Sequence, residues 1–445
     1  MNRMKKSIFR TMSALLLLSV VTACETKKEL PYFPTAIEIV RPADIANLTI
    51  ESERLTFRNV ANGTVTEFTS TAGIELPTGL YECSYEADVT YVNNPSEGSA
   101  GEGNADEGAT VKGRLVGGIE SMEVTGGNLA FSITTSLVLD NEDFIIEEIF
   151  FTGTLRSSGS QYYGDNYIKI YNNTDKVLYA DGLAFCESKF TSTQYLAYTP
   201  DLRKSAMTVH AIYVVPGSGK EHPVQPGESL VICDTGIDHR NANPNSFDLS
   251  NAGFEWYDVS TNPSQTDIDS PTVPNMDKWY SYTQSYFVLH NRGFKSYALA
   301  RIPIAKEQYL KDYYYSYDYT LVLPSGTFPM TQSAYKLPNE WIVDGVNCSV
   351  EAAREWNILP PTVDAGWTYC GKTDGDKTRY FKSVRRKMLY LTADGRRKLK
   401  DTNNSTNDFN PECVPSIIEQ QQSAIDAAGT KATTVTYDGV QPVKQ

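Results

Sequence analysis

Alternation of apolar and polar side chains over residues 81–91 constrains the fold more than any other feature of this sequence. In the run YECSYEADVTY every odd-numbered position is apolar or aromatic, and every even-numbered position is polar. A period of two places the two sets on opposite faces of a β-strand. These residues therefore predict a half-buried strand, with Cys83 pointing into a core.

The same strand-and-turn pattern fills residues 34–158. Short apolar or alternating segments recur at residues 36–40, 48–50, 54–58, 110–116 and 128–139, separated by turn pairs such as Asn62-Gly63 and Gly126-Gly127. Several such strands can bury their apolar faces only by forming two sheets that pack over one core. This predicts an antiparallel β-sandwich for residues 34–158. Residues 93–108 lack an apolar anchor and predict a mobile loop. The largely apolar run 144–151 predicts a strand covered on both faces, at the junction with a second domain.

The N-terminus has the pattern of an export signal that ends at Cys24. Lys5, Lys6 and Arg10 precede an apolar core at residues 15–21, which is shorter than the roughly 18 residues of a membrane-spanning helix. The segment VTAC resembles the lipobox of bacterial lipoproteins, which implies cleavage before Cys24 and acylation, palmitate included, of that cysteine. The alternative is an ordinary secretory signal whose cleavage site happens to lie beside a cysteine. We expect residues 1–23 to be a signal peptide and residues 24–33 a lipidated tether.

Charge and cysteine usage narrow the class of protein further. The 445-residue chain has 54 acidic and 40 basic residues, and four of the basic ones lie in the leader. A chain this acidic is repelled by phosphate backbones, so we expect no nucleic-acid partner. Beyond Cys24, six widely spaced cysteines permit up to three disulfides, although buried thiols are expected for some of them. Those six are Cys83, Cys186, Cys233, Cys348, Cys370 and Cys413.

The second part of the chain, residues 159–413, begins with strand, polar turn and strand over residues 167–183. These residues resemble the opening hairpin of the lamin-tail domain, an immunoglobulin-like β-sandwich. Pro226-Gly227 before residues 229–232, and the segment 383–387 followed by 401–409, resemble other landmarks of that domain. The long insertion at residues 241–277 departs from the pattern. Residues 414–445 are expected to form a C-terminal tail.

Taken together, the segments FIIEEIFFTGTL (144–155), YIKIYNNTD (167–175), PNEWIVDG (338–345) and VDAG (363–366) resemble an uncharacterised family of Bacteroides-group lipoproteins. In that family a prealbumin-like, carboxypeptidase-regulatory-like sandwich precedes a lamin-tail-like domain. The predicted fold class is therefore all-β, with two antiparallel β-sandwiches and long insertions in the second. The resemblance also implies that the protein accompanies an outer-membrane TonB-dependent transporter. It supplies no catalytic motif.

Residues that could carry catalysis or hold a metal are few in the sequence. The four histidines (His210, His222, His239 and His290) match no zinc-binding spacing, and no GxSxG motif marks a nucleophile. Acidic runs at residues 140–143 and 374–376 could ligate calcium, although neither fits an EF-hand loop. The sequence therefore assigns no catalytic residue, metal or cofactor. A hydrolase with its site in the insertion of the second domain remains an alternative.

A tyrosine-rich segment is the strongest candidate for a binding surface. Tyr313, Tyr315, Tyr317 and Tyr319 recur at period two, so they would line one face of a strand, with Trp279 near them in the sequence. Such rings suit stacking on sugars or filling a protein interface. The alternative is that they pack a sandwich core and reach its rim with their hydroxyls.

These observations predict a lipid-anchored accessory lipoprotein of the outer membrane, facing the cell surface, that binds rather than catalyses. Its expected partners are the membrane through the lipid anchor, an outer-membrane transporter, and a glycan or protein ligand. A surface adhesin or structural spacer is the alternative from a different functional class.

Overall fold

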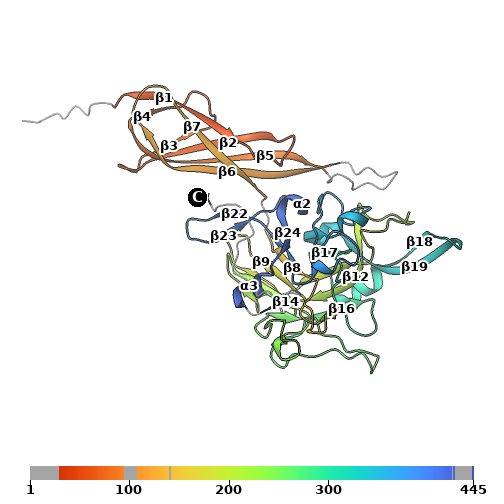
Figure 1. The fold of residues 1–445 in the computed structure, drawn as a ribbon. Coiled ribbons are helices and arrows are strands. Elements are labelled where there is room, and N and C mark those ends of the chain that lie inside the picture. The colour runs from red at the N-terminus through yellow and green to blue at the C-terminus, as the bar shows by residue number, and fades with distance from the viewer. Residues whose placement is uncertain (1–29, 95–107, 140–141, 423, 426–442, 445) are drawn as a thin grey trace, which may run out of the picture.

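The computed structural model describes residues 30–94, 108–139, 142–422, 424–425 and 443–444, in which strands predominate. The first strands form an elongated N-terminal unit, and the rest of the chain forms a larger second unit beside it (Figure 1). The predicted all-β class with more than one sandwich is confirmed, because helices are short and several sheets share the chain. None of the helices in the described ranges has the length and apolar character needed to cross a bilayer.

The N-terminal unit consists of β1 (Tyr32–Val40), β2 (Thr49–Asn59), β3 (Val65–Phe68), β4 (Glu75–Pro77), β5 (Gly79–Asn93), β6 (Ala109–Val124) and β7 (Leu129–Val138). The strand order is β3-β2-β5-β6-β7-β1-β4, with antiparallel pairs except between β1 and β7. The odd-numbered residues 81–91 of β5 are buried in one core and the even-numbered ones face outward, as the alternation predicted. Cys83 is 5% exposed.

Two sheets form the sandwich of the second unit. One sheet has the order β15-β14-β9-β8-β21-β24. Its strands are β8 (Ile145–Phe150), β9 (Tyr167–Tyr171), β14 (Ser229–Cys233), β15 (Phe254–Glu255), β21 (Ser383–Arg386) and β24 (Phe409–Cys413). The other has the order β18-β19-β12-β11-β17-β20, and β16 also pairs with β12. Its strands are β11 (Leu183–Ser188), β12 (Ala206–Val214), β16 (Asp277–Ser281), β17 (Ser296–Arg301), β18 (Tyr314–Leu323), β19 (Gly326–Pro338) and β20 (Ile342–Asn347).

Shorter elements complete this unit. Two small sheets pair β10 (Leu178–Tyr179) with β13 (Pro223–Val224), and β22 (Met388–Leu391) with β23 (Arg397–Leu399) and β25 (Val443–Lys444). The α-helices are α1 (Lys306–Asp312), α2 (Ser405–Asp408) and α3 (Ser416–Gln421). The 3-10 helices are η1 (His239–Asn241), η2 (Asn339–Trp341), η3 (Glu351–Ala353) and η4 (Lys377–Arg379).

The main core lies between the two large sheets of the second unit. Ile146 and Ile170 from one sheet belong to the same buried cluster as Phe185 and Tyr213 from the other. Further apolar clusters cover the outer faces, where α1 packs on the sheet of β11 and β12, and α3 on that of β8 and β9. Every residue of β8 is buried, as the run 144–151 predicted.

The structure corrects three of the sequence-based predictions. β8, placed in the N-terminal sandwich by the predicted range 34–158, pairs with β9 and β21 and so belongs to the second unit. The predicted tail from residue 414 begins instead with α3, whose Ile417 and Ile418 enter a core cluster. The hairpin predicted over residues 167–183 does not form, because β9 pairs with β8 and β14 while β10 pairs with β13.

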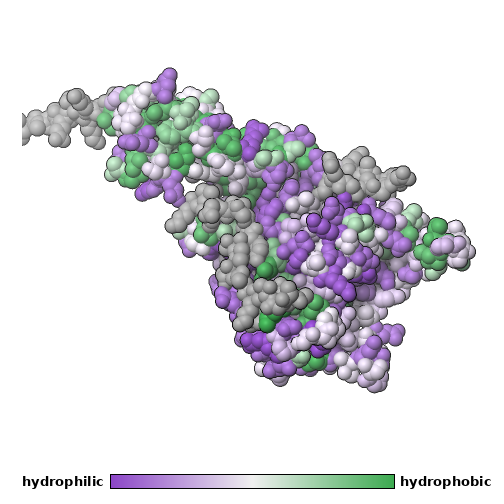
Figure 2. All heavy atoms as spheres, in the orientation of Figure 1, coloured by the Kyte–Doolittle hydropathy of each residue, from purple (hydrophilic) through white to green (hydrophobic). Residues whose placement is uncertain are grey.

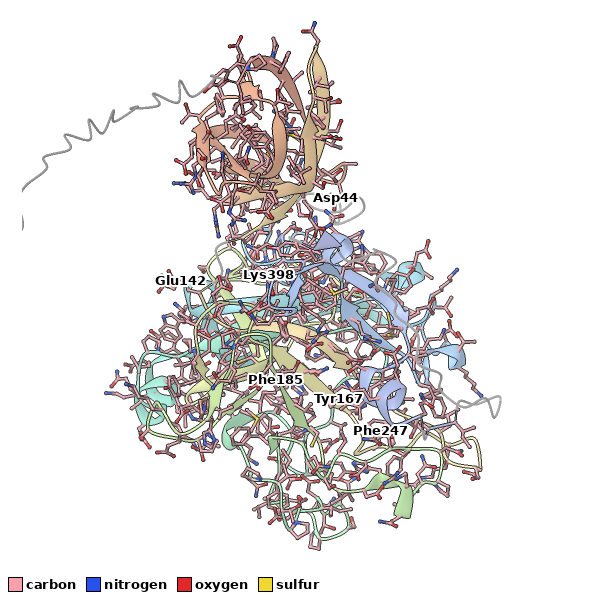
Figure 3. All side chains as sticks on the ribbon, turned by 90° about the vertical axis from the view of Figure 1, so that its left-hand side faces the viewer. Asp44, Glu142, Tyr167, Phe185, Phe247 and Lys398 are labelled. Atoms are coloured by element: carbon pink, nitrogen blue, oxygen red, sulfur yellow. The ribbon has the colours of Figure 1, made fainter. Side chains whose placement is uncertain are left out.

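Specific hydrogen bonds join the two units. The Tyr91 hydroxyl donates to the Thr402 carbonyl at 2.9 Å, and the Asn93 amide donates to the same carbonyl at 3.0 Å. Asp44 lies on the side of the N-terminal unit that faces the second unit (Figure 3), where it pairs with Lys400. The end of β5 therefore rests directly on the loop before α2.

All six described cysteines are free thiols and buried. Burial raises the pKa of the Cys83 thiol to about 12. Each thiol thus behaves as a small apolar side chain, as was expected for some of them. Cys24 and most of the loop predicted for residues 93–108 lie outside the described residues.

Candidate functional site

The tyrosine-rich segment forms the first strand of a long hairpin, β18–β19, that projects from the second unit (Figure 1). Tyr315, Tyr317 and Tyr319 share one face of β18, as the period of two predicted. Tyr314 and the even-numbered residues after it are exposed on the opposite face. The pairing of β18 with β19 extends to Leu323 opposite Gly326, so the hairpin keeps its register to its end.

The rings on that face are covered by neighbouring aromatic side chains. Tyr317 is 2% exposed and meets Phe190 at 5.3 Å and Tyr198 at 5.6 Å between ring centroids. Phe190 and Tyr198 stack on each other at 3.8 Å, and Trp356 extends the cluster. We call Phe190, Tyr198, Tyr317 and Trp356 the aromatic cluster. It fixes the base of the hairpin to the body of the second unit.

The hydroxyls of this face also find partners. The Tyr317 hydroxyl donates to Gln332 at 3.1 Å, and the Gln332 amide donates to the Tyr319 hydroxyl at 3.1 Å. The Tyr315 hydroxyl hydrogen-bonds with Thr208. This geometry corresponds to the core-packing alternative considered from the sequence.

The two other predicted residues lie elsewhere. Tyr313 ends α1 and does not belong to β18; its ring stacks on Tyr309 at 5.3 Å and meets Trp341 at 4.9 Å. Trp279, on β16, contacts Tyr309 at 5.9 Å. The prediction of four tyrosines on one strand face is therefore wrong for Tyr313, because a helix ends where the strand was expected to begin.

The far end of the hairpin carries exposed apolar side chains. Val322 is 72% exposed, Leu323 45% and Phe328 41%. Figure 2 shows apolar atoms gathered at this end, beyond a largely polar body. We call these three residues the hairpin tip. A sequence interpretation based on the tyrosines misses the tip, because Val322 and Leu323 are aliphatic and Phe328 lies on the next strand.

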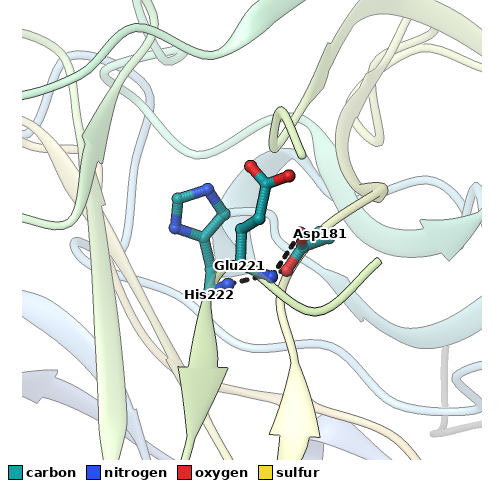
Figure 4. A group of neighbouring side chains, drawn as sticks. All are labelled: Asp181, Glu221 and His222. Carbon is teal, nitrogen blue, oxygen red and sulfur yellow. Dashed lines mark hydrogen bonds between the residues drawn. The ribbon is translucent and has the colours of Figure 1, made fainter. Parts of the chain in front are cut away.

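Asp181, Glu221 and His222 bring three potential metal ligands within 4.8 Å of one another (Figure 4), and in the described part of the chain no other such group occurs. The Asp181 carboxylate, however, accepts backbone N–H groups of Glu221 at 2.9 Å and His222 at 2.8 Å. These bonds and a third from Gly219 lower the pKa of Asp181 despite its burial. The carboxylate therefore closes a turn.

A second polar cluster brings together two of the four histidines. Glu187 is buried and accepts a hydrogen bond from the His210 ring nitrogen Nδ1 at 2.9 Å, and from the backbone N–H of His290 at 3.2 Å. Burial lowers the pKa of His290 to about 4. Sequence spacing could not reveal this cluster, because it joins β11, β12 and the loop before β17.

The geometry expected of a nucleophilic triad is not found among the described residues. The histidine rings hydrogen-bond to Glu187, the Tyr162 hydroxyl, the Thr235 carbonyl and the Phe294 N–H. Within the described ranges, no serine, threonine or cysteine side chain reaches a histidine nitrogen. The acidic runs serve as pairing partners: Asp143 binds Arg301 at 2.8 Å, and Asp374 binds Arg292 at 2.5 Å. Asp140 and Asn141 lie outside the described residues.

Comparison with known proteins relates the chain to an uncharacterised family. Residues 225–416 match the family described as Protein of unknown function (DUF4876). A crystal structure of a DUF4876 family protein from Bacteroides thetaiotaomicron is similar over 89% of this chain and 99% of that chain, with 18% identity and a TM-score of 0.54. This likeness supports the fold. The comparison with curated proteins found no match.

A second structure, described as "a putative adhesin from Bacteroides ovatus", covers 70% of this chain and 87% of that chain, with 9% identity and a TM-score of 0.16. A similarity this low supports no conclusion about the fold or the function of this chain. The predicted relation to an uncharacterised Bacteroides family is thus supported at the level of DUF4876. The lipoprotein identity and the two named domain types stay predictions.

Proposed function

We propose that this chain is a lipid-anchored outer-membrane lipoprotein that binds a protein partner through the hairpin tip. The observation that carries the proposal is the exposure of Val322, Leu323 and Phe328 at the end of a projecting hairpin. Exposed apolar side chains gathered at one place favour a protein interface, because their burial against a partner is stabilising.

The construction of the hairpin supports a docking role over sugar binding. Stacking on a sugar needs an open aromatic face, whereas Tyr317 is 2% exposed and is covered by Phe190 and Tyr198. The aromatic cluster holds the base of the hairpin, so the hairpin tip is presented on a rigid support. Pre-organisation of this kind lowers the entropy lost on binding.

The partner that we propose is an outer-membrane TonB-dependent transporter, which follows from the family resemblance of the sequence. Affinity capture from detergent-solubilised outer membranes tests it. A triple variant with Val322→Ser, Leu323→Ser and Phe328→Ser is expected to recover at least tenfold less transporter than the unchanged protein.

The matched control changes exposed aliphatic residues outside the hairpin. Val259 is 75% exposed and Ile268 58%, so V259S with I268S makes the same chemical change and should leave capture unaltered. Equal recovery by the triple variant would contradict docking at the tip. Binding of the unchanged protein to host matrix, with no transporter captured, would favour the adhesin alternative.

The anchor that we propose at Cys24 makes its own prediction. The unchanged protein should fractionate with outer membranes, and Cys24→Ser should move it to the soluble fraction, because a serine cannot form the thioether. Thr26→Ser in the tether is the control and should remain with the membrane. Mass spectrometry of the mature N-terminus measures acylation directly, and protease shaving of intact cells tests the surface orientation. An unmodified N-terminus at Cys24 would contradict the anchor.

A further inference from the structure

A buried carboxylate lies at the end of β14, between two neighbouring strands. Asp234 directly follows β14, and its backbone N–H donates to the Asn166 carbonyl at 2.9 Å, next to β9. On the other side, the backbone N–H of Trp256 donates to the backbone carbonyl of Cys233 at 3.1 Å, beside β15. Since paired residues on adjacent strands place their side chains side by side on one face, Asp234 is flanked by Asn166 and Trp256.

Two acceptor atoms at this position have no donor. The oxygens Asp234 Oδ2 and Asn166 Oδ1 are buried without a hydrogen-bond partner in the part of the chain that the structure describes. The Asn166 amide nitrogen donates to the Phe150 carbonyl at 3.1 Å, which fixes the orientation of the amide and leaves its oxygen free. Asp234 as a whole is 2% exposed. Buried polar atoms without a hydrogen-bond partner are rare, and they destabilise the folded state unless a ligand or water binds them.

Asp234 also lies among other carboxylates. Four further carboxylates act on it electrostatically: Asp165, Glu255, Asp258 and Asp267. Lys278 lies 2.7 Å from Asp258, but in the described ranges no ion pair reaches Asp234 or Asp165.

We propose that Asp234 and Asn166 are ligands of a divalent cation, calcium in preference to magnesium. Calcium accepts about 6–8 oxygens from carboxylates, amides, main-chain carbonyls and water in loose geometry, whereas magnesium demands a near-ideal octahedron. A group of three His, Cys, Asp or Glu residues with ligand atoms within 4.8 Å of one another occurs among the described residues only at Asp181, Glu221 and His222. Carboxylates therefore supply at most two of the ligand residues here, and amide, main-chain and water oxygens supply the others.

Calorimetry and thermal unfolding of the full mature chain test this site. Calcium chloride added to EDTA-treated protein should bind at one site and raise the Tm. Asp234→Asn should weaken binding at least 100-fold, and should raise the Tm of the EDTA-treated protein because it removes a buried charge without changing the shape of the side chain. Glu221→Gln, an exposed change in the Asp181 group, is the control and should leave calcium binding unaltered.

Terbium, a luminescent substitute for calcium, gives a second measurement. Emission excited through tryptophan should appear in the unchanged protein, fall several-fold in Trp256→Phe, and be displaced by calcium, while Trp256→Phe keeps its calcium affinity. Absence of calcium binding to the unchanged protein, or equal binding to Asp234→Asn, would overturn the proposal. Loss of binding in Glu221→Gln would place the cation at Asp181 and overturn it as well.

Discussion

Arg386→Met is expected to destabilise the second unit by about 3–5 kcal/mol, because it removes the shared partner of three buried carboxylates. The Arg386 side chain is 2% exposed and lies 2.6 Å from Asp344, 3.1 Å from Asp401 and 3.8 Å from Asp408. Burial raises the pKa of Asp344 and Asp408, and the guanidinium opposes that rise. Without the guanidinium, these carboxylates must lie uncompensated in the core or take up protons.

Urea unfolding followed by tryptophan fluorescence measures this loss, since all five tryptophans lie in the second unit. In the variant the folded-state pKa values of Asp344 and Asp408 rise further above their unfolded values. The folded state then binds more protons than the unfolded state, so stability should fall as pH rises from 5 to 8. Arg240→Met is the control: its side chain is 42% exposed beside Asp238, and its loss should cost below about 1 kcal/mol. Similar small losses in both variants would contradict the role of Arg386.

Tyr317→Ala is expected to cost about 3–4 kcal/mol, because it leaves a cavity in the aromatic cluster. The ring is 2% exposed and meets both Phe190 and Tyr198 edge-on. Tyr317→Phe should cost only about 1 kcal/mol, since it removes one hydrogen bond, to Gln332, and keeps the ring. The same fluorescence measurement applies, with Trp356, whose ring contacts Phe190, as the reporter.

Tyr314→Ala is the matched control, because Tyr314 lies on the opposite face of β18 and is 55% exposed. Its loss should change stability by about 0.5–1 kcal/mol at most. If Tyr317→Ala left stability unaltered and abolished partner capture, the tyrosine face itself, rather than the hairpin tip, would be the binding surface.

The alternation of apolar and polar residues predicted those strands well that bury only one face. Residues 81–91 alternate in the sequence, and the structure buries the predicted side. The turn at Pro226-Gly227 lies directly before β14, with Gly227 at φ +82, a conformation that favours glycine. In both cases the signal is carried by neighbours in the sequence, so no tertiary information was needed.

Pairing between distant segments could not be predicted in the same way. β8 reads equally well as the last strand of the first unit or as part of the second, and only its contacts with β9 and β21 decide between them. Residues 167–183 have the pattern of a hairpin, yet β9 pairs with β8 and β14 while β10 pairs with β13. Strands that are adjacent in the sequence often pair. Here the packing of two sheets over one core places these segments beside other strands instead.

The sequence by itself determined that this is an all-β chain rich in half-buried strands, and it predicted an anchor at Cys24. Only the tertiary structure decided which polar side chains carry special roles. Asp234, Asn166 and Arg386 belong to no metal-binding or catalytic motif in the sequence, and what sets them apart is burial beside residues that are distant along the chain. The free energy of a charge depends on the atoms around it, and those atoms are assembled only when the sheets pack.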